Sequence, residues 1–155
     1  MSESALAADC EERLLTFEVG RSLYALPIAG VIEVAEVGPL ACIPSLPVHI
    51  GGVVNHRGDA LPVLRRASLL DVDEAALPEP AHVLVVTDRA TGGARLGLPV
   101  DRIVGLVDGA AAVARGGHPV AERRPIAGRV ANVLDPKQLV ARAQEVIERS
   151  LVRSE

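Results

Sequence analysis

The chain has 155 residues, of which 49% are hydrophobic and 23% are charged, and its formal net charge is -4. These values are typical of a soluble globular protein, and the negative charge gives no general attraction for nucleic-acid phosphates. Phe17 and Tyr24 account for the 1% of aromatic residues, which excludes a base-stacking surface. We therefore expect no nucleic-acid partner and a core of Val, Leu, Ile and Ala, which favours strands.

The first twelve residues contain acids and no long apolar run. We expect a flexible N-terminus over residues 1–12 that is neither a secretory signal nor a membrane-inserted segment. The protein is accordingly expected in the cytoplasm. In that reducing compartment Cys10 and Cys42 are expected to remain thiols.

Two parts of the chain resemble each other. The stretch Tyr24–Val34 (YALPIAGVIEV) aligns with Leu96–Leu106 (LGLPVDRIVGL) at a constant offset of 72 residues (98 minus 26). Each copy follows an alternating strand and a turn, so the repeated unit is predicted to be a hairpin followed by a third strand.

The repeat continues with a change of offset. Ile50–Gly52 resembles Ile126–Gly128 at offset 76, and Val63–Leu64 resembles Val133–Leu134 at offset 70. On this alignment the second copy is six residues shorter (76 minus 70), and a hairpin between Gly128 and Val130 is missing. The alignment therefore predicts a trimmed second half.

Short strands with frequent Gly and Pro predict a mainly β fold built as two small barrels. We expect the first barrel over residues 13–76 and the second over 81–135, and we leave open that they exchange strands. A helix and tail are expected over 136–155, because Asp135 can cap the first turn and Pro136 suits the first helical position. A shorter helical turn is predicted over Arg66–Leu70.

No catalytic or metal-binding constellation is found. The best acid–base pair, His56 with Asp59, lies in one polar turn, where such pairs are typical of surfaces. The four histidines lack the spacing of a metal site. We expect no enzymatic activity, no metal and no cofactor.

Four segments in order resemble the CheW-like domain of bacterial chemosensory adaptors. They are LLTFEVGRSLYALPIAGVIEVAEV, IPSLPVHIGGVVNHRGDALPVL, HVLVVTD with RLGLPVDRIVGLV, and RVANVLDPKQLV, and together they span Leu14 to Val140. The most specific element is GVxNxRG followed by a proline, which is met by Gly52–Gly58 and Pro62. The resemblance implies two SH3-like barrels, a CheW-like fold, and an adaptor that links the cytoplasmic tip of a chemoreceptor to the regulatory domain of a CheA-type histidine kinase.

The resemblance also implies protein-binding residues. Those on the NxRG hairpin, which is implicated in receptor contact, are Asn55, Arg57 and Gly58. Gly52 and Val53 lie on the strand that feeds this hairpin, and Pro62 is the motif's proline in the next strand. Those on the strand near the kinase surface are Ile32, Glu33 and Val34, and those of the second half's signature are Gly97 and Asp101. The implied location is the cytoplasm, in association with receptor arrays.

Several readings stay open at this point. Arg57 either holds its loop by hydrogen-bonding nearby carbonyls or reaches a carboxylate or carbonyl of a helical partner. Glu33 is either a solvated strand residue or a contact. Ile32 is either exposed for a partner or displaced by a bulge, because neighbouring strand side chains point to opposite faces.

Three departures from the family pattern bear on function. His56 stands where the family commonly has an aliphatic residue, and Arg65–Arg66 stand where the family usually has a strand-ending Asp-Leu. The second half of the chain is expected to be shortened. The shortening leads to the hypothesis that receptor binding survives while kinase docking is weakened. The alternatives are an accessory array component that binds receptor without kinase, and a small-ligand sensor with a site between the barrels.

Overall fold

The computed structural model describes residues 13–36, 50–88, 93–113 and 118–153. The predicted flexible N-terminus and both cysteines lie outside these residues. The strands are β1 (Arg13–Val19), β2 (Ser22–Pro27), β3 (Val31–Glu36), β4 (Ile50–His56), β5 (Asp59–Leu64), β6 (His82–Val86), β7 (Leu96–Val100), β8 (Arg102–Asp108), β9 (Val120–Ile126) and β10 (Arg129–Leu134). The helices are η1 (Ile28–Gly30), α2 (Arg66–Leu70), η2 (Glu74–Ala76) and α3 (Pro136–Arg153). The expected mainly β fold with a C-terminal helix is confirmed.

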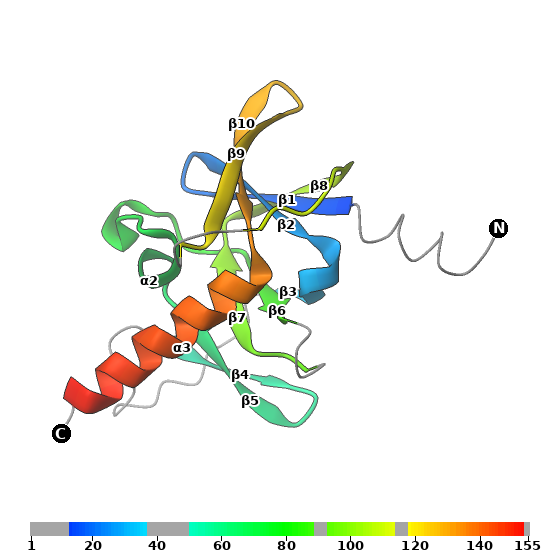
Figure 1. Cartoon of the computed structure of the whole chain (residues 1–155). Coiled ribbons are helices and arrows are strands. Elements are labelled where there is room, and N and C mark those ends of the chain that lie inside the picture. The colour runs from blue at the N-terminus through cyan, green and yellow to red at the C-terminus, as the bar shows by residue number, and fades with distance from the viewer. Residues whose placement is uncertain (1–12, 37–49, 89–92, 114–117, 154–155) are drawn as a thin grey trace.

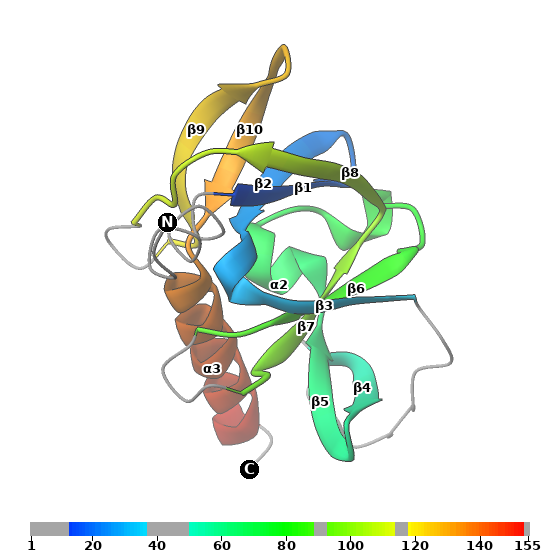
Figure 2. The ribbon, with the colours of Figure 1, turned by 90° about the vertical axis from the view of Figure 1, so that its right-hand side faces the viewer.

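The strands form two five-stranded sheets that draw on both halves of the chain. Sheet 1 has the order β8-β1-β2-β10-β9, and sheet 2 has the order β3-β6-β7-β5-β4. Each sheet therefore combines a hairpin from one half with three strands from the other, and neither follows the contiguous boundaries 13–76 and 81–135. Figures 1 and 2 show the β9–β10 and β4–β5 hairpins projecting from opposite ends of the molecule.

Both sheets curl so that their two edge strands approach each other. In sheet 1 the buried residues Leu14, Ala25 and Val133 pack against Val107 of β8 and Ile126 of β9, which are the two edges. In sheet 2 the edges β3 and β4 meet where Glu33 faces His56. Each sheet is thus a partly open barrel with its own seam.

One aliphatic core lies between the sheets and is covered by the helices. Its members come from sheet 1, sheet 2, α2 and α3, and include Phe17, Leu26, Leu84, Leu98, Leu69 and Leu139. Phe17 and Tyr24 pair across β1 and β2 with their rings stacked at 5.9 Å. Burial, and to a lesser degree the charge of Asp71, raises the pKa of Tyr24 above its usual value.

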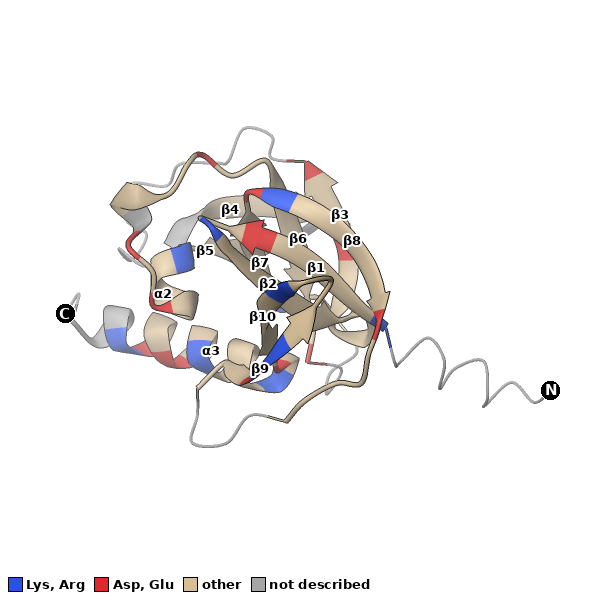
Figure 3. Ribbon diagram, turned by 90° about the horizontal axis from the view of Figure 1, so that it is seen from above, with Lys and Arg blue, Asp and Glu red and all other residues tan. Residues whose placement is uncertain are grey.

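The helix α3 begins as its sequence predicts. The Asp135 side chain accepts a hydrogen bond from the Lys137 amide at 3.0 Å, which satisfies a free donor of the first turn. Leu139 and Ala143 are buried and Val146 and Ile147 are partly buried, so this face packs on the core. Basic and acidic positions are interspersed along the helix, as Figure 3 shows.

The predicted loss of a hairpin from the second half is wrong. The β9–β10 hairpin matches the β4–β5 hairpin residue for residue at a constant offset of 70 (120 minus 50). Its turn residues Ala127 and Gly128 have φ of 50° and 80°, against 51° and 88° for Arg57 and Gly58. The error arose because Gly51–Gly52 lies inside a strand, whereas the similar-looking Ala127–Gly128 is the turn.

Candidate protein-docking site

The β4–β5 hairpin carries most of the residues that the resemblance implied. Positive φ at both Arg57 and Gly58 identifies the turn as type I′, the form that suits the twist of a two-residue hairpin. The Asn55 side chain accepts a hydrogen bond from the Gly58 amide at 2.9 Å and so braces the turn. Glycine adopts this conformation readily, but arginine does so at a cost of about 1 kcal/mol.

Arg57 is exposed at the tip of this hairpin. Across the described side chains, no hydrogen bond or ion pair of its guanidinium is seen, and the turn is held by Asn55 instead. Of the two readings left open by the sequence, the loop-holding role therefore has no contact to support it. The guanidinium remains available for a partner.

The strand β3 forms the opposite edge of sheet 2. A bulge interrupts its pairing with β6 between Val31 and Glu33, and Ile32 within this bulge is half-buried. The side chain of Glu33 is 44% exposed, and Val34 is 42% exposed. The bulge explains how neighbouring residues of one strand, Glu33 and Val34, are both exposed at the edge of sheet 2.

A groove of about 460 Å³ lies where β3 approaches the β4–β5 hairpin. Its lining residues come from three separate segments and are Ile32, His56, Arg57, Ala60, Leu61, Pro62, Gly93, Ala94 and Arg95. Beside it, the imidazole Nδ1 of His56 lies 3.6 Å from a carboxylate oxygen of Glu33. The curl of sheet 2 thus brings the expected receptor-contact and kinase-contact residues to one place.

The other implied residues lie away from this groove or beneath the surface. Gly52 is buried and Val53 is half-buried within β4. Gly97 is buried in β7 opposite Val63, where an added Cβ would lie 2.8 Å from a methyl of Val83. The close packing explains the glycine without any partner.

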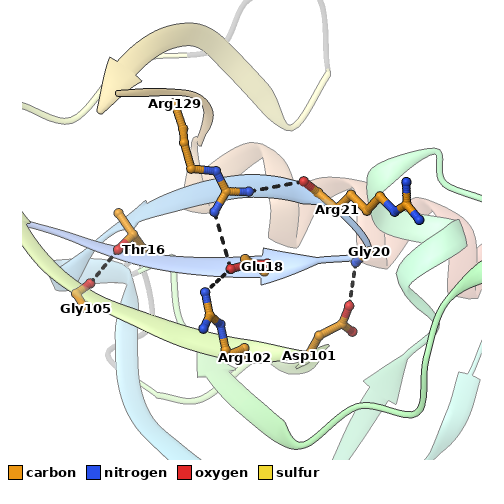
Figure 4. Close-up of polar contacts among 8 residues, drawn as sticks. All are labelled: Thr16, Glu18, Gly20, Arg21, Asp101, Arg102, Gly105 and Arg129. Carbon is orange, nitrogen blue, oxygen red and sulfur yellow. Dashed lines mark hydrogen bonds and ion pairs between the residues drawn. The ribbon is translucent and has the colours of Figure 1, made fainter. Parts of the chain in front are cut away.

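Asp101 is an internal bridge. One carboxylate oxygen accepts a hydrogen bond from Arg66 at 2.6 Å, and the other accepts one from the Gly20 amide at 2.5 Å. Figure 4 shows the second of these contacts. The Arg66 and Asp101 side chains are only 6% and 11% exposed, so Asp101 has a structural role within this chain.

In sheet 1, charged side chains form hydrogen bonds that join neighbouring segments at one end of the barrel, its mouth. Glu18 accepts hydrogen bonds from Arg102 and from Arg129, the latter at 3.3 Å, and Arg129 also donates to the Arg21 carbonyl at 3.2 Å (Figure 4). The hydrogen bond from Arg102, helped by the charges of both arginines, holds the pKa of Glu18 below its ordinary value against a smaller opposing effect of desolvation. This cluster ties β1 to β8 and β10.

Sequence reasoning missed part of the groove. Arg95 and Ala94 precede β7 and reach the hairpin only through the curl of sheet 2, so no spacing along the chain indicates them. Ala60 and Leu61 follow the recognised motif directly, and their proximity to Pro62 was the available signal. His56 stood out as a departure from the family pattern and as a possible acid–base partner of Asp59, but not as part of a binding groove.

A second hollow, of about 230 Å³, lies between η1, the end of β6 and the first turn of α3. Pro27, Ala29, Ala112 and Pro136 contribute apolar walls, and Asp88 and Lys137 stand among its polar lining residues. Among the described residues no group of acidic, His or Cys side chains is arranged to hold a metal ion. The described helices include none with the length and apolarity needed to span a membrane.

Comparisons with known proteins agree with this architecture. Protein FrzA of Myxococcus xanthus is 34% identical over 106 residues, covering 67% of this chain and 64% of its own. Chemotaxis protein CheW of Treponema pallidum is 29% identical over 105 residues, covering 64% and 59%. The chain thus spans slightly less than two thirds of the length of each of these relatives.

At the level of structure, the scaffolding protein TtCheW of Thermoanaerobacter tengcongensis superposes with a TM-score of 0.64 over 80% of this chain and 84% of its own, at 18% identity. This likeness shows a shared fold. The model of the CheW-like domain matches residues 13–144, which include every described strand and the first half of α3. The chain belongs to the CheW-like domain family.

Proposed function

We propose that this chain is a non-catalytic adaptor of a bacterial chemosensory system. It binds the cytoplasmic tip of a chemoreceptor and couples it to the regulatory domain of a CheA-type histidine kinase, in the cytoplasm and in association with receptor arrays. Membership of the CheW-like family supports the class of function. The geometry of sheet 2 supports the assignment of surfaces.

The observation that carries receptor binding is the state of Arg57. The chain keeps an arginine in a left-handed turn position where asparagine or glycine is favoured, although the turn is braced by Asn55. Backbone strain retained without an intramolecular contact is typical of functional positions. A planar guanidinium on a rigid tip is suited to the carbonyls and carboxylates of a helical partner.

Kinase docking is assigned to the β3 edge. Among the described strands β3 has a single neighbour, β6, and it carries an exposed Val34 and an exposed Glu33. Such an edge can pair with a strand of another barrel while the side chains give specificity. The expected weakening of kinase docking has lost its premise, since the second half keeps its hairpin.

Replacing Arg57 with asparagine separates binding from folding. Arg57→Asn relieves the left-handed backbone and is expected to raise the thermal unfolding midpoint, yet it removes the guanidinium. We expect binding to a soluble coiled-coil fragment of a receptor tip, measured by calorimetry, to weaken about tenfold or more, because charge-assisted contacts are worth about 1.5–3 kcal/mol.

The matched control is Ala127→Asn in the equivalent turn of sheet 1, where φ is 50°. It should stabilise the fold to a similar extent and leave receptor binding unchanged. Equal receptor affinity of Arg57→Asn and wild type would contradict the assignment of this tip.

The kinase surface is tested by Val34→Asp with an isolated kinase regulatory domain. Val34 is 42% exposed and is not among the residues that line the groove. We expect this change to weaken kinase binding, because it places a charge in an apolar contact, and to leave receptor binding within about threefold of wild type. Binding of wild type to the receptor tip without any binding to the kinase domain would instead indicate the accessory array component.

A further inference from the structure

Three cationic or ionisable groups converge on the groove of sheet 2. Arg57 comes from the hairpin turn, His56 from the end of β4, and Arg95 from the residue before β7. Only Arg57 belongs to the recognised motif. The other two come from positions that the family signature does not assign.

Their placement is fixed by contacts outside the groove. The Arg95 guanidinium lies 3.5 Å from Asp88, with both side chains largely buried, and its backbone amide donates to the Val86 carbonyl at 2.8 Å. The imidazole of His56 is 11% exposed and lies beside Glu33. Arg95 and His56 are therefore held in position before any partner arrives, which lowers the entropic cost of binding.

The remaining walls of the groove are mostly apolar. Ile32, Leu61 and Pro62 supply aliphatic surface, and Ala60 and Ala94 leave room between them. Among the described lining residues none carries a carboxylate, in a chain whose net charge is -4. The cations of the groove therefore favour a partner with an acidic side chain, and its apolar walls favour an aliphatic side chain next to it.

The fold itself does not require these groups. At the equivalent positions of sheet 1, offsets of 70 and 72 place Ile126 for His56, Ala127 for Arg57 and Leu23 for Arg95. All three are apolar, and the sheet nevertheless forms the same five strands. The five-stranded arrangement therefore does not depend on a cation at these three positions, although Arg95 and His56 each contact an acidic side chain within this chain.

We propose that this groove binds an acidic side chain flanked by an aliphatic one on the helical tip of the receptor, with Arg57 and Arg95 as the carboxylate-binding groups and His56 beside them. The inference rests on the proposed function, since it names the partner chemistry of that same site. Arg95 becomes a specificity-determining residue.

The test introduces a competing carboxylate without removing a native contact. Ala60 is exposed and lines the groove, so Ala60→Asp places a negative charge beside the arginines and Ala60→Asn places a neutral group of the same size. With the receptor-tip fragment as probe, we expect Ala60→Asp to weaken binding about tenfold and Ala60→Asn by less than about threefold. Val130→Asp, the equivalent change in sheet 1, should have no effect.

A second measurement identifies the partner residue. Each Glu or Asp of the fragment is replaced by Gln or Asn, and one replacement should weaken binding as much as Arg95→Gln does. Combining that replacement with Arg95→Gln should cost less than the sum of the two, because both remove one interaction.

The outcomes separate this inference from the proposed function. Equal binding of Ala60→Asp and Ala60→Asn overturns the inference, while the Arg57→Asn comparison still decides receptor binding. A loss confined to the kinase domain overturns the choice of the receptor as occupant. Absence of any binding by wild type overturns both proposals.

Discussion

The two barrels of this molecule have equivalent strand orders, but they differ in the side chains at their open ends, which we call their mouths. At the mouth of sheet 1, Glu18 binds Arg102 and Arg129 and joins three strands. The corresponding positions of sheet 2, at offsets of 69, 72 and 70, hold Thr87, Gly30 and Asp59, and a groove of about 460 Å³ lies on this side. In sheet 1 these charged side chains pair with one another, whereas the groove of sheet 2 is lined by His56, Arg57 and Arg95.

The interiors differ as well. Leu14, Ala25 and Val133 fill the small core of sheet 1. Their equivalents in sheet 2 are Val83, Gly97 and Val63, which pack so closely that no Cβ fits at Gly97. The sizes of the three side chains therefore differ between the two barrels, and each set fits only its own interior.

The joints between the sheets form a third contrast. On one side Arg66, which follows β5, binds Asp101 and through it the Gly20 turn of sheet 1. At the equivalent position on the other side, Pro136 packs against Gly30 beside the hollow of about 230 Å³. The two sheets are thus joined by hydrogen bonds of Asp101 on one side and by apolar packing of Pro136 on the other. Since aliphatic packing is non-directional, the ion pair is well placed to fix the register of the sheets.

The largest effect is expected from breaking the polar joint. Arg66→Ala leaves the carboxylate of Asp101 buried with only the Gly20 amide, and we expect a loss of about 3 kcal/mol in the free energy of unfolding measured with urea. The double variant Arg66→Met/Asp101→Asn removes both charges, fills the space and keeps an acceptor for the Gly20 amide, so it should cost clearly less. Arg149→Ala, which breaks an exposed pair with Glu145, should cost about 0.5 kcal/mol or less.

A loss for Arg66→Ala no greater than that for Arg149→Ala would show that the joint does not depend on this pair. A large loss for Arg66→Ala, together with a clearly smaller loss for Arg66→Met/Asp101→Asn and faster amide exchange at Gly20 in Arg66→Ala, is the pattern of a contact that specifies register.

The equivalent positions Gly97 and Ala25 differ by one methyl group, and we expect that exchanging the residue type at either position lowers the stability of the fold. Gly97→Ala places a methyl 2.8 Å from Val83 and 3.1 Å from Val63, which we expect to cost about 1–3 kcal/mol. Ala25→Gly in sheet 1 removes a buried methyl and loosens the backbone, at about 1 kcal/mol. Thermal unfolding of the two variants checks both values. Stabilisation by Gly97→Ala would mean that sheet 2 has room to spare.

The sequence predicted those features of the fold that depend on residues close together in the chain. The offset of 72 located β2, β3, β7 and β8, because the Leu-Pro pattern is kept in both copies. The capping of α3 was readable from Asp135 and Pro136, since it depends on neighbours in sequence. Exchange of strands was left open, because alternation describes the two faces of a strand and carries no information about its pairing partner.

Residues of the candidate groove were named from the sequence where they are contiguous in the chain, and those from distant segments were missed. Asn55 and Arg57 belong to one hairpin and were recognised together. Arg95 joins them only through the curl of sheet 2, and Arg66 finds Asp101 only through packing of the two sheets. Gly97 and Asp101 stood out in the sequence for structural reasons, since a short motif does not distinguish a contact with a partner from one within the fold.

The smallest effect, and the one that tests the closed mouth directly, concerns Glu18. Its pKa lies below the ordinary value of 4.5, so its stabilising contribution is present above that pH and is lost as the pH falls through the lower folded-state pKa. Glu18→Gln keeps an acceptor for Arg102 but removes the charge. The stability difference between wild type and variant, measured with urea, should favour wild type at pH 7, shrink below pH about 4.5 and diminish in high salt. A difference that stays constant with pH and salt would mean that apolar packing closes this mouth, and the contrast between the barrels would then rest on the groove of sheet 2 alone.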